Sequence, residues 1–541
     1  MDSKRASRKT IGLAIVVLLV TGCGGAQTEP TDTPVPAEPT STTASVITGE
    51  LPAYWPTDGW RTSTPEEQGM NSEKLSDMLA FIQRDRLNID SVTIIRNGYM
   101  VVDVTFFPFP PESRHIIHSC TKSIVSTLVG IAIEQGYIES VQQPVLDFFP
   151  ERTAANLTAD KEAMTLENTL NMSTGLKCQD SYLYHWRGLE EMAQSPDWVQ
   201  FVLDLPMAQE PGTYFEYCNG ASFLLSAIIQ ETTGMPALEF AEQHLFAPLG
   251  ISDAVWPSNP QGITIGWGEL CIRPHDMAKI GYLYLNEGLW EGEQVVPASW
   301  VEAATRQHIS AGTLEDGYGY QWWVDDSGMY MAVGYRGQYI VVVPEKEMVV
   351  VFTSDLADDL SRFPRHLVDH FIVPAAESLT PLPANPDGVA RLQTLIQEAA
   401  AQPEVTPQPV PPPPAIAEQV LGETYILEKN VLGLESFSLV RQEEVEAWLH
   451  LTWDETVPFT EAEYRIGLDG IQRLATGMYG MPAASTGNWE GESAFIVEID
   501  ETSILVNWRL ELNFQNDQVT ATITGNFPET YVIQGKRAGS P

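Results

Sequence analysis

The sequence predicts an α+β fold, in which an antiparallel sheet is flanked by helices and a helical subdomain, followed by a small all-β, barrel-like C-terminal domain. A hairpin at residues 91–107 comes before a long helical, loop-rich middle, and four strands and a helix come after it. The last part of the chain has short alternating apolar and polar runs without a strong helix. This order of elements does not suit a doubly wound parallel sheet.

The elements of the first part follow from local signals. Residues 72–83 have helical apolar spacing, and Asn97-Gly98 is a typical hairpin turn. An apolar helix begins near Ser119 and meets a stop signal at Gly136. The later strands are expected at residues 320–324, 329–335, 339–343 and 348–353, and the last helix near residues 362–371.

Changes in composition predict five segments. A stretch rich in Thr, Pro and Ser near the N-terminus is typical of a disordered tether, and a later Pro-rich stretch is typical of a stiff linker. The C-terminal domain shows no catalytic motif, so we expect it to dock on the larger domain or contact carbohydrate, with a plain spacer as the alternative. The expected segments are a signal peptide at residues 1–22, a tether at 23–52, a larger domain at 53–400, a linker at 401–415 and the β-rich domain at 416–541.

The N-terminus resembles a bacterial lipoprotein signal. Basic residues come before an apolar run at residues 11–20, which is too short to span a bilayer as a permanent helix. Thr21 and Gly22 are small and stand directly before Cys23. We therefore expect cleavage before Cys23, a lipid on its sulfur and an extracytoplasmic, membrane-anchored protein, with an ordinary signal peptide or plain anchor as the alternative.

The charge of the chain argues against nucleic acid as a partner. Lys and Arg total 30 and Asp and Glu total 72, which gives a net charge of −42 at pH 7. A surface of that sign repels phosphate. It is more simply explained as a solvated surface that keeps an exported protein in solution.

Four cysteines remain besides Cys23, an even number that suits an oxidising compartment. Cys120, Cys178, Cys218 and Cys271 allow three pairings. Cys178 and Cys218 both lie in loop-like segments, so a bridge between them is one candidate, and four buried free thiols are the alternative. No spacing of Cys and His matches a zinc site, so we expect no metal.

The most informative chemical feature is Ser119-Cys120-Thr121-Lys122 at the start of the apolar helix. Side chains three residues apart share a helix face, so the Lys122 amine can reach the Ser119 hydroxyl. Burial lowers the proton affinity of a lysine, which allows the amine to take the serine proton. The pattern also arises by chance, but here about three turns of uncharged residues follow the lysine.

A second candidate is the triplet Tyr217-Cys218-Asn219, which a Pro-Gly turn delivers before another apolar helix. The phenol can relay a proton, and the amide can bind both the lysine and a substrate carbonyl. The pattern is weak alone, because it recurs at Tyr284-Leu285-Asn286 within a segment of helical spacing. Core packing is the simpler explanation for that second copy.

The third candidate is the segment Tyr335-Arg336-Gly337-Gln338. Gly337 allows a substrate to approach a strand edge closely, and the Gln338 backbone amide is then a donor to an oxyanion. The alternative is a glycine that marks a bulge or turn between two strands.

These three motifs, in this order, resemble those of serine hydrolases in the penicillin-binding protein and class C β-lactamase superfamily. The resemblance is strongest to the esterase and amide-hydrolase branches, which include 6-aminohexanoate-dimer hydrolases. It covers residues 60–373, including connecting segments at residues 164–176 and 245–251. It implies a β-lactamase/transpeptidase-like fold and no metal or cofactor.

The resemblance also implies a role for each matching residue. Ser119 would be the acylated nucleophile, Lys122 its base, Tyr217 the proton relay and Asn219 a substrate-orienting amide. The backbone amides of Ser119 and Gln338 would form the oxyanion hole.

One departure bears on the substrate. β-Lactamases and the peptidases that cross-link cell walls carry Lys-Thr-Gly as their third motif, whereas this chain has Tyr335-Arg336-Gly337. Without that lysine, esters or small amides are favoured, with a β-lactam or a peptide as the alternative substrate. We therefore expect a lipid-anchored serine hydrolase, and the alternative is a cell-envelope binding protein that uses the same scaffold without turnover.

Overall fold

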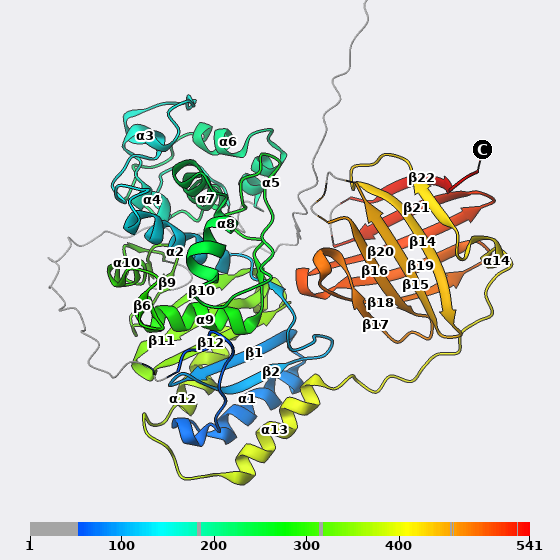
Figure 1. The fold of residues 1–541 in the computed structure, drawn as a ribbon, viewed down its shortest axis with the longest axis horizontal. Coiled ribbons are helices and arrows are strands. Elements are labelled where there is room, and N and C mark those ends of the chain that lie inside the picture. Colours follow the sequence, from blue (N-terminus) through cyan, green and yellow to red (C-terminus); the bar gives the residue numbers. More distant parts are fainter. Residues whose placement is uncertain are drawn as a thin grey trace, which may run out of the picture.

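Two folded bodies make up the part of the chain that this computed structural model describes, namely residues 52, 54–180, 186–312, 317–454, 457, 459–526 and 529–540. An N-terminal body of helices and sheet is joined by an extended segment to a C-terminal barrel (Figure 1). The expected signal peptide and the Cys23 lipidation site lie outside the described residues. Within the described ranges, no helix combines the length and apolarity that crossing a bilayer requires.

An eight-stranded antiparallel sheet organises the N-terminal body, in the order β2-β1-β12-β11-β10-β9-β8-β7. Every residue of β1, β11 and β12 is buried, which explains why these strands are rich in Val and Ile. Asn97 and Gly98 form the predicted hairpin turn, with φ values of 51° and 75°. The strands are β1 Ile89–Arg96, β2 Tyr99–Thr105, β7 Ile309–Ser310, β8 Gly317–Tyr318, β9 Trp323–Val324, β10 Tyr330–Gly334, β11 Gln338–Val343 and β12 Met348–Ser354.

Helices cover both faces of this sheet (Figure 1). Helices α2 and α9 pack on one face, and α1 and α13 lie on the other. Helix α13 is not among the elements predicted from the sequence, and it begins after the capping side chain of Asn385. The helices are α1 Ser72–Asp85, α2 Cys120–Glu134, α3 Ala159–Ala163, α4 Leu166–Leu170, α5 Arg187–Gln194, α6 Trp198–Asp204, α7 Asn219–Thr233, α8 Ala237–Ala241, α9 Pro274–Leu285, α10 Ala298–Ala304, α11 Phe363–Leu367, α12 Val373–Ala375 and α13 Pro386–Ala400.

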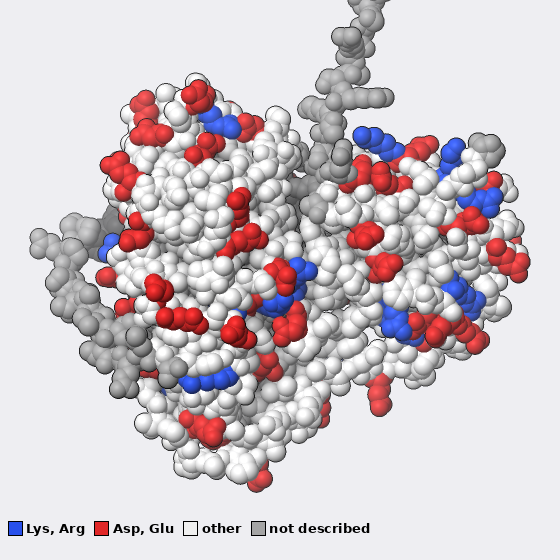
Figure 2. All heavy atoms as spheres, in the orientation of Figure 1, with Lys and Arg blue, Asp and Glu red and all other residues white. Residues whose placement is uncertain are grey.

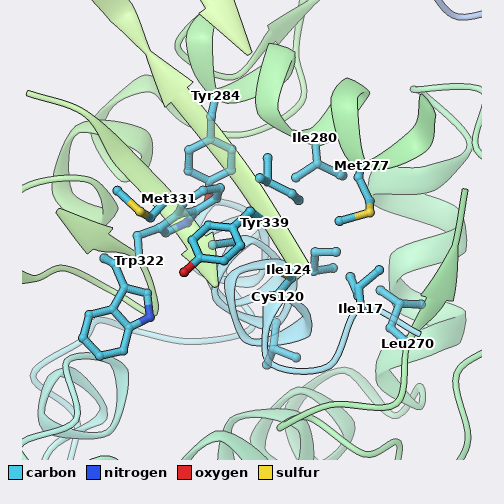
Figure 3. Close-up of a cluster of buried hydrophobic side chains, with 14 of the residues drawn as sticks. Ile117, Cys120, Ile124, Leu270, Met277, Ile280, Tyr284, Trp322, Met331 and Tyr339 are labelled. Atoms are coloured by element: carbon cyan, nitrogen blue, oxygen red, sulfur yellow. The ribbon is translucent and has the colours of Figure 1, made fainter. Parts of the chain in front are cut away.

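The start of α2 is anchored in the core beside the sheet. Figure 3 shows Cys120 and Ile124 of α2 among side chains from α9 and the strands, including Met277 and Tyr339. The Cys120 thiol also donates a hydrogen bond to the Gln338 carbonyl oxygen at 3.4 Å. The first turn of α2 is therefore held against the beginning of β11.

The C-terminal body is a closed barrel of nine strands. Its antiparallel order runs β16-β15-β14-β13-β22-β21-β20-β19-β18, and a parallel pairing of β16 with β18 closes it. A further strand, β17, pairs with β18. The elements are α14 Ala417–Val420, β13 Thr424–Leu427, β14 Leu434–Glu443, β15 Glu446–Trp453, β16 Glu461–Gly467, β17 Arg473–Thr476, β18 Pro482–Glu490, β19 Ala494–Glu501, β20 Val506–Gln515, β21 Gln518–Gly525 and β22 Tyr531–Arg537.

The barrel docks on a small ribbon of the N-terminal body, formed by β3 His115–Ile116 and β4 Cys271–Ile272. Ile116 and Cys271 belong to the same hydrophobic cluster as the barrel interior. The Arg114 guanidinium donates hydrogen bonds to the carbonyl oxygens of Asp253, Tyr479 and Gly480, and so ties the two bodies together. Figure 2 shows acidic side chains spread over both bodies on the visible face, in keeping with the net charge of −42.

Candidate active site

Ser119 stands at the N-terminal end of α2. It occupies the capping position, but its side chain caps no backbone amide. Its oxygen lies instead 3.0 Å from Lys122 Nζ, one turn further along the helix. The Ser119 N–H has no backbone acceptor among the described residues, and the positive end of the helix dipole lies beside it.

Lys122 is buried and contacts three oxygen atoms. Besides Ser119 Oγ, its amine lies 2.8 Å from Asn219 Oδ1 and 2.6 Å from the Trp267 carbonyl oxygen. Burial lowers the pKa of Lys122 to about 7, against the opposing influence of the Asp180 carboxylate. The amine is therefore largely neutral at slightly alkaline pH.

Tyr217 and Asn219 reach the same place from the N-terminal end of α7. The Tyr217 ring centroid lies 4.9 Å from Lys122 Nζ, and the ring stacks against Trp323 at 6.3 Å. The second Tyr-x-Asn triplet lies elsewhere, since Tyr284 is buried on α9 and its hydroxyl bonds to Thr127 Oγ1 at 2.7 Å. The structure thus brings Ser119, Lys122, Tyr217 and Asn219 together and leaves the second copy in the core.

A disulfide between Cys178 and Cys218 secures the N-terminal end of α7. It places Asp180 where its carboxylate accepts the Asn219 N–H at 2.7 Å. Burial raises the pKa of Asp180. Cys120 and Cys271 are free and buried.

The third motif forms the turn between β10 and β11. Arg336 and Gly337 have φ values of 59° and 91°, which is typical of a tight hairpin turn. A Cβ atom on Gly337 would lie 2.4 Å from Ser354 Oγ, so the glycine is needed for the turn and for packing against β12. This geometry corresponds to the turn alternative stated for Gly337.

The side chains of Tyr335, Arg336 and Gln338 lie in different surroundings. Tyr335 lines the cavity beside Ser119. Arg336 forms an ion pair with Asp355 and is absent from the cavity lining. The Gln338 side chain donates to the Ser354 carbonyl oxygen at 2.5 Å. Arg336 therefore does not take the place of the lysine found in the Lys-Thr-Gly motif.

Both bodies contribute to a cavity of about 110 Å³ at Ser119. The N-terminal body provides Asn219, Trp267 and Tyr335, and the barrel provides Tyr479, Ile504 and Val506. The barrel residues come from the turn at Met478–Gly480 and from the start of β20 with the turn before it. The C-terminal domain is therefore part of the candidate site, a role that no motif in its sequence indicates.

His118, directly before the serine, is a further feature that the motifs do not reveal. Its φ is 43°, an uncommon value for a residue with a side chain. Burial, reinforced by the charges of Arg336 and Lys122, lowers the pKa of His118 to about 3. The ring is therefore neutral at working pH, and it lines the cavity without adding a charge.

Asp180, the Trp267 carbonyl and the barrel residues are site components that no sequence motif indicates, for different reasons. Asp180 comes two residues after Cys178, so it could be predicted to lie near Asn219 once Cys178 is known to be bonded to Cys218. The Trp267 carbonyl could not be predicted, because every residue has a backbone carbonyl and its position depends on the fold. The barrel residues are brought to the site only by docking of the two bodies.

Comparison with known proteins identifies the family. The family model described as Beta-lactamase matches residues 80–370, more than half of the chain. The chain therefore belongs to the β-lactamase family. The predicted β-lactamase/transpeptidase-like fold with a C-terminal barrel, and membership of the penicillin-binding protein and β-lactamase superfamily of serine hydrolases, are confirmed.

Individual relatives are distant. The chain is 23% identical over 325 residues to 6-aminohexanoate-dimer hydrolase from Paenarthrobacter ureafaciens, covering 56% of this chain and 81% of that protein. It is similar to a solved putative 6-aminohexanoate-dimer hydrolase from Bacillus anthracis, with 19% identity, a TM-score of 0.49, and coverage of 61% and 89%. A penicillin-binding protein homologue from Pyrococcus abyssi has 17% identity, a TM-score of 0.45, and coverage of 86% and 99%.

Replacing both Cys178 and Cys218 by serine should lower the free energy of unfolding by about 2–4 kcal/mol, because the bridge closes a loop of 40 residues. Denaturant unfolding of the wild type and the double variant measures the difference. A reducing agent should destabilise the wild type by a similar amount and leave the variant unaffected. Equal stability of the oxidised wild type and the variant would contradict this assignment.

Proposed function

We propose that the protein is an exported, lipid-anchored serine hydrolase that cleaves small esters or amides through an acyl-enzyme on Ser119. The observation that carries the proposal is the set of three oxygen contacts around Lys122 Nζ. Family membership supports hydrolase chemistry in general.

The contacts of Lys122 explain how the serine is activated. A neutral amine has two N–H donors and one lone pair. The Asn219 and Trp267 oxygens can only accept, so the two N–H groups are used there. The lone pair is left for the Ser119 hydroxyl proton, 3.0 Å away.

The reaction then follows in two steps. The Ser119 proton passes to Lys122 Nζ while Oγ bonds to the substrate carbonyl carbon, and the backbone amide of Ser119, which lines the cavity, stabilises the oxyanion. The carbonyl re-forms as the bond to the leaving group breaks, and Tyr217 relays a proton from Lys122 to that group. In the second step, water attacks the acyl carbonyl carbon while Tyr217 and Lys122 take its proton. The bond to Ser119 Oγ then breaks, Oγ receives the proton, and the acid is released.

The substrate class follows from two features. Arg336 is paired with Asp355, so the third motif offers no free cation for the carboxylate of a β-lactam or wall peptide. The relative from Paenarthrobacter ureafaciens is named a 6-aminohexanoate-dimer hydrolase. The first feature disfavours substrates that need a cation from this motif, and the second favours an amide.

Replacing Ser119 by alanine should abolish labelling by a fluorophosphonate probe and lower ester hydrolysis by about 10³-fold or more, because the nucleophile is lost. Replacing Lys122 by alanine should lower ester hydrolysis by about 10²–10⁴-fold. Gel fluorescence and release of 4-nitrophenol from 4-nitrophenyl butanoate measure the two effects.

Ser123→Ala is the matched control, because Ser123 is a buried serine of α2 whose hydroxyl donates to the Gln321 carbonyl oxygen at 2.6 Å. This variant should still be labelled. A wild-type protein that is neither labelled nor active would favour the non-catalytic binding protein instead.

The pH dependence should report the lysine. If neutral Lys122 is the base, kcat/KM for 4-nitrophenyl butanoate should rise about tenfold per pH unit below pH 7 and level off above it, since burial lowers the Lys122 pKa to about 7. Asp180→Asn removes a carboxylate that raises the Lys122 pKa, so the rising limb should move to lower pH. A limb that continues to rise beyond pH 9, or that moves upward in the variant, would contradict this assignment.

The proposed lipid anchor makes a prediction of its own. Cys23→Ser should prevent attachment of the lipid, and so leave the protein unprocessed or release it from the membrane fraction. Treatment of the producing bacterium with globomycin should have the same effect. Fractionation and metabolic labelling with a fatty acid measure the outcome. Unchanged labelling in Cys23→Ser would exclude this cysteine as the lipidation site.

A further inference from the structure

The cavity at Ser119 is lined mainly by apolar side chains. Among its described lining residues, one has a side chain that carries a charge. Leu189, Pro257 and Ile504 contribute hydrocarbon surface, and Trp267 and Tyr479 contribute aromatic surface. The lining histidine, His118, is neutral at working pH because burial lowers its pKa to about 3. The charged side chain is Glu269.

Glu269 has no counter-charge among the residues that the structure describes. The described residues show no ion pair and no hydrogen bond to its carboxylate, and no lysine or arginine lines the described cavity. Burial raises the pKa of Glu269 to about 7. Glu269 is half-buried, so its carboxylate is open to a ligand that enters the cavity, while the described lining offers it no charged partner.

The chain path places Glu269 beside the reacting serine. It comes two residues after Trp267, whose carbonyl oxygen holds Lys122 Nζ at 2.6 Å. At the intervening Gly268, a Cβ atom would lie 3.9 Å from the backbone carbonyl of His118. Glu269 and Ser119 therefore line one small cavity from adjacent segments.

We propose that Glu269 selects substrates that carry a positively charged amine a few bonds from the ester or amide cleaved at Ser119. This inference rests on the proposed hydrolase function and goes beyond it, because it names the charge of the substrate. An ammonium group in the cavity pairs with the carboxylate and supplies the missing hydrogen bonds. The aromatic rings of Trp267 and Tyr479 also suit a cation.

The arrangement also explains the direction of the preference. An anionic substrate would place a second negative charge in a low-dielectric cavity, which is unfavourable. A neutral substrate would displace water from beside the Glu269 carboxylate without supplying a counter-charge. A cationic substrate alone removes both costs.

The test compares isosteric substrates that differ only in charge. For the acyl side, the pair is the 4-nitrophenyl esters of 3-aminopropanoic acid and butanoic acid. For the leaving-group side, the pair is butyrylcholine and 3,3-dimethylbutyl butanoate. The quantity measured is the ratio of kcat/KM for the cationic ester to that for the neutral ester, at pH 8 where Glu269 is ionised.

We expect a ratio of about tenfold or more in at least one pair for the wild type, and a ratio near one for Glu269→Gln. Glu302→Gln is the matched control, since Glu302 is exposed on α10, away from the cavity lining, and should keep the wild-type ratio. Because each variant is judged by a ratio, a general loss of stability or activity does not imitate the result.

The outcomes separate this inference from the proposed function. Hydrolysis of the neutral esters with ratios near one in both wild-type pairs would overturn the role of Glu269 and leave the hydrolase intact. A wild-type preference that persists in Glu269→Gln would also overturn it. Absence of hydrolysis of all four esters, together with absence of fluorophosphonate labelling, would overturn the proposed function itself.

Discussion

A lysine amine buried without a carboxylate in contact is the constraint on which the rest of the site depends. No ion pair to Lys122 is found among the described residues, and its neighbours are the oxygen atoms of Ser119, Asn219 and Trp267. A charged amine is costly in such surroundings, so the neutral form is favoured. Only a rigid arrangement keeps the two acceptors in place, and the surrounding fold supplies that rigidity.

That rigidity comes from several independent attachments. The first turn of α2 is fixed in the core through Cys120, and the N-terminal end of α7 is fixed by the Cys178–Cys218 disulfide. The Asn219 N–H is held in turn by Asp180. The first attachment restrains the segment of Ser119 and the other two restrain Asn219, so the contacts of Lys122 depend on segments that are far apart in the sequence.

The sequence alone predicts the parts of this structure that local patterns determine. The hairpin at Asn97-Gly98, the helix after Ser119 and the strands of the barrel follow from turn residues and periodicity. The Ser119 and Lys122 pair follows from helix spacing. The Trp267 carbonyl, Glu269 and the turn containing Tyr479 could not be predicted, because their position depends on the tertiary path of the chain and on docking of the barrel, which leave no local pattern.

The shared cavity has a consequence for how such a protein diversifies. The residues that line the cavity around Ser119 belong to the N-terminal body, whereas Tyr479, Ile504 and Val506 belong to the C-terminal barrel, which closes on itself. Substitutions in the barrel turns can therefore alter which molecules are accepted without disturbing the reacting groups. Part of the selectivity is therefore encoded in a module separate from the reacting groups, while Glu269 lies on the same body as Ser119.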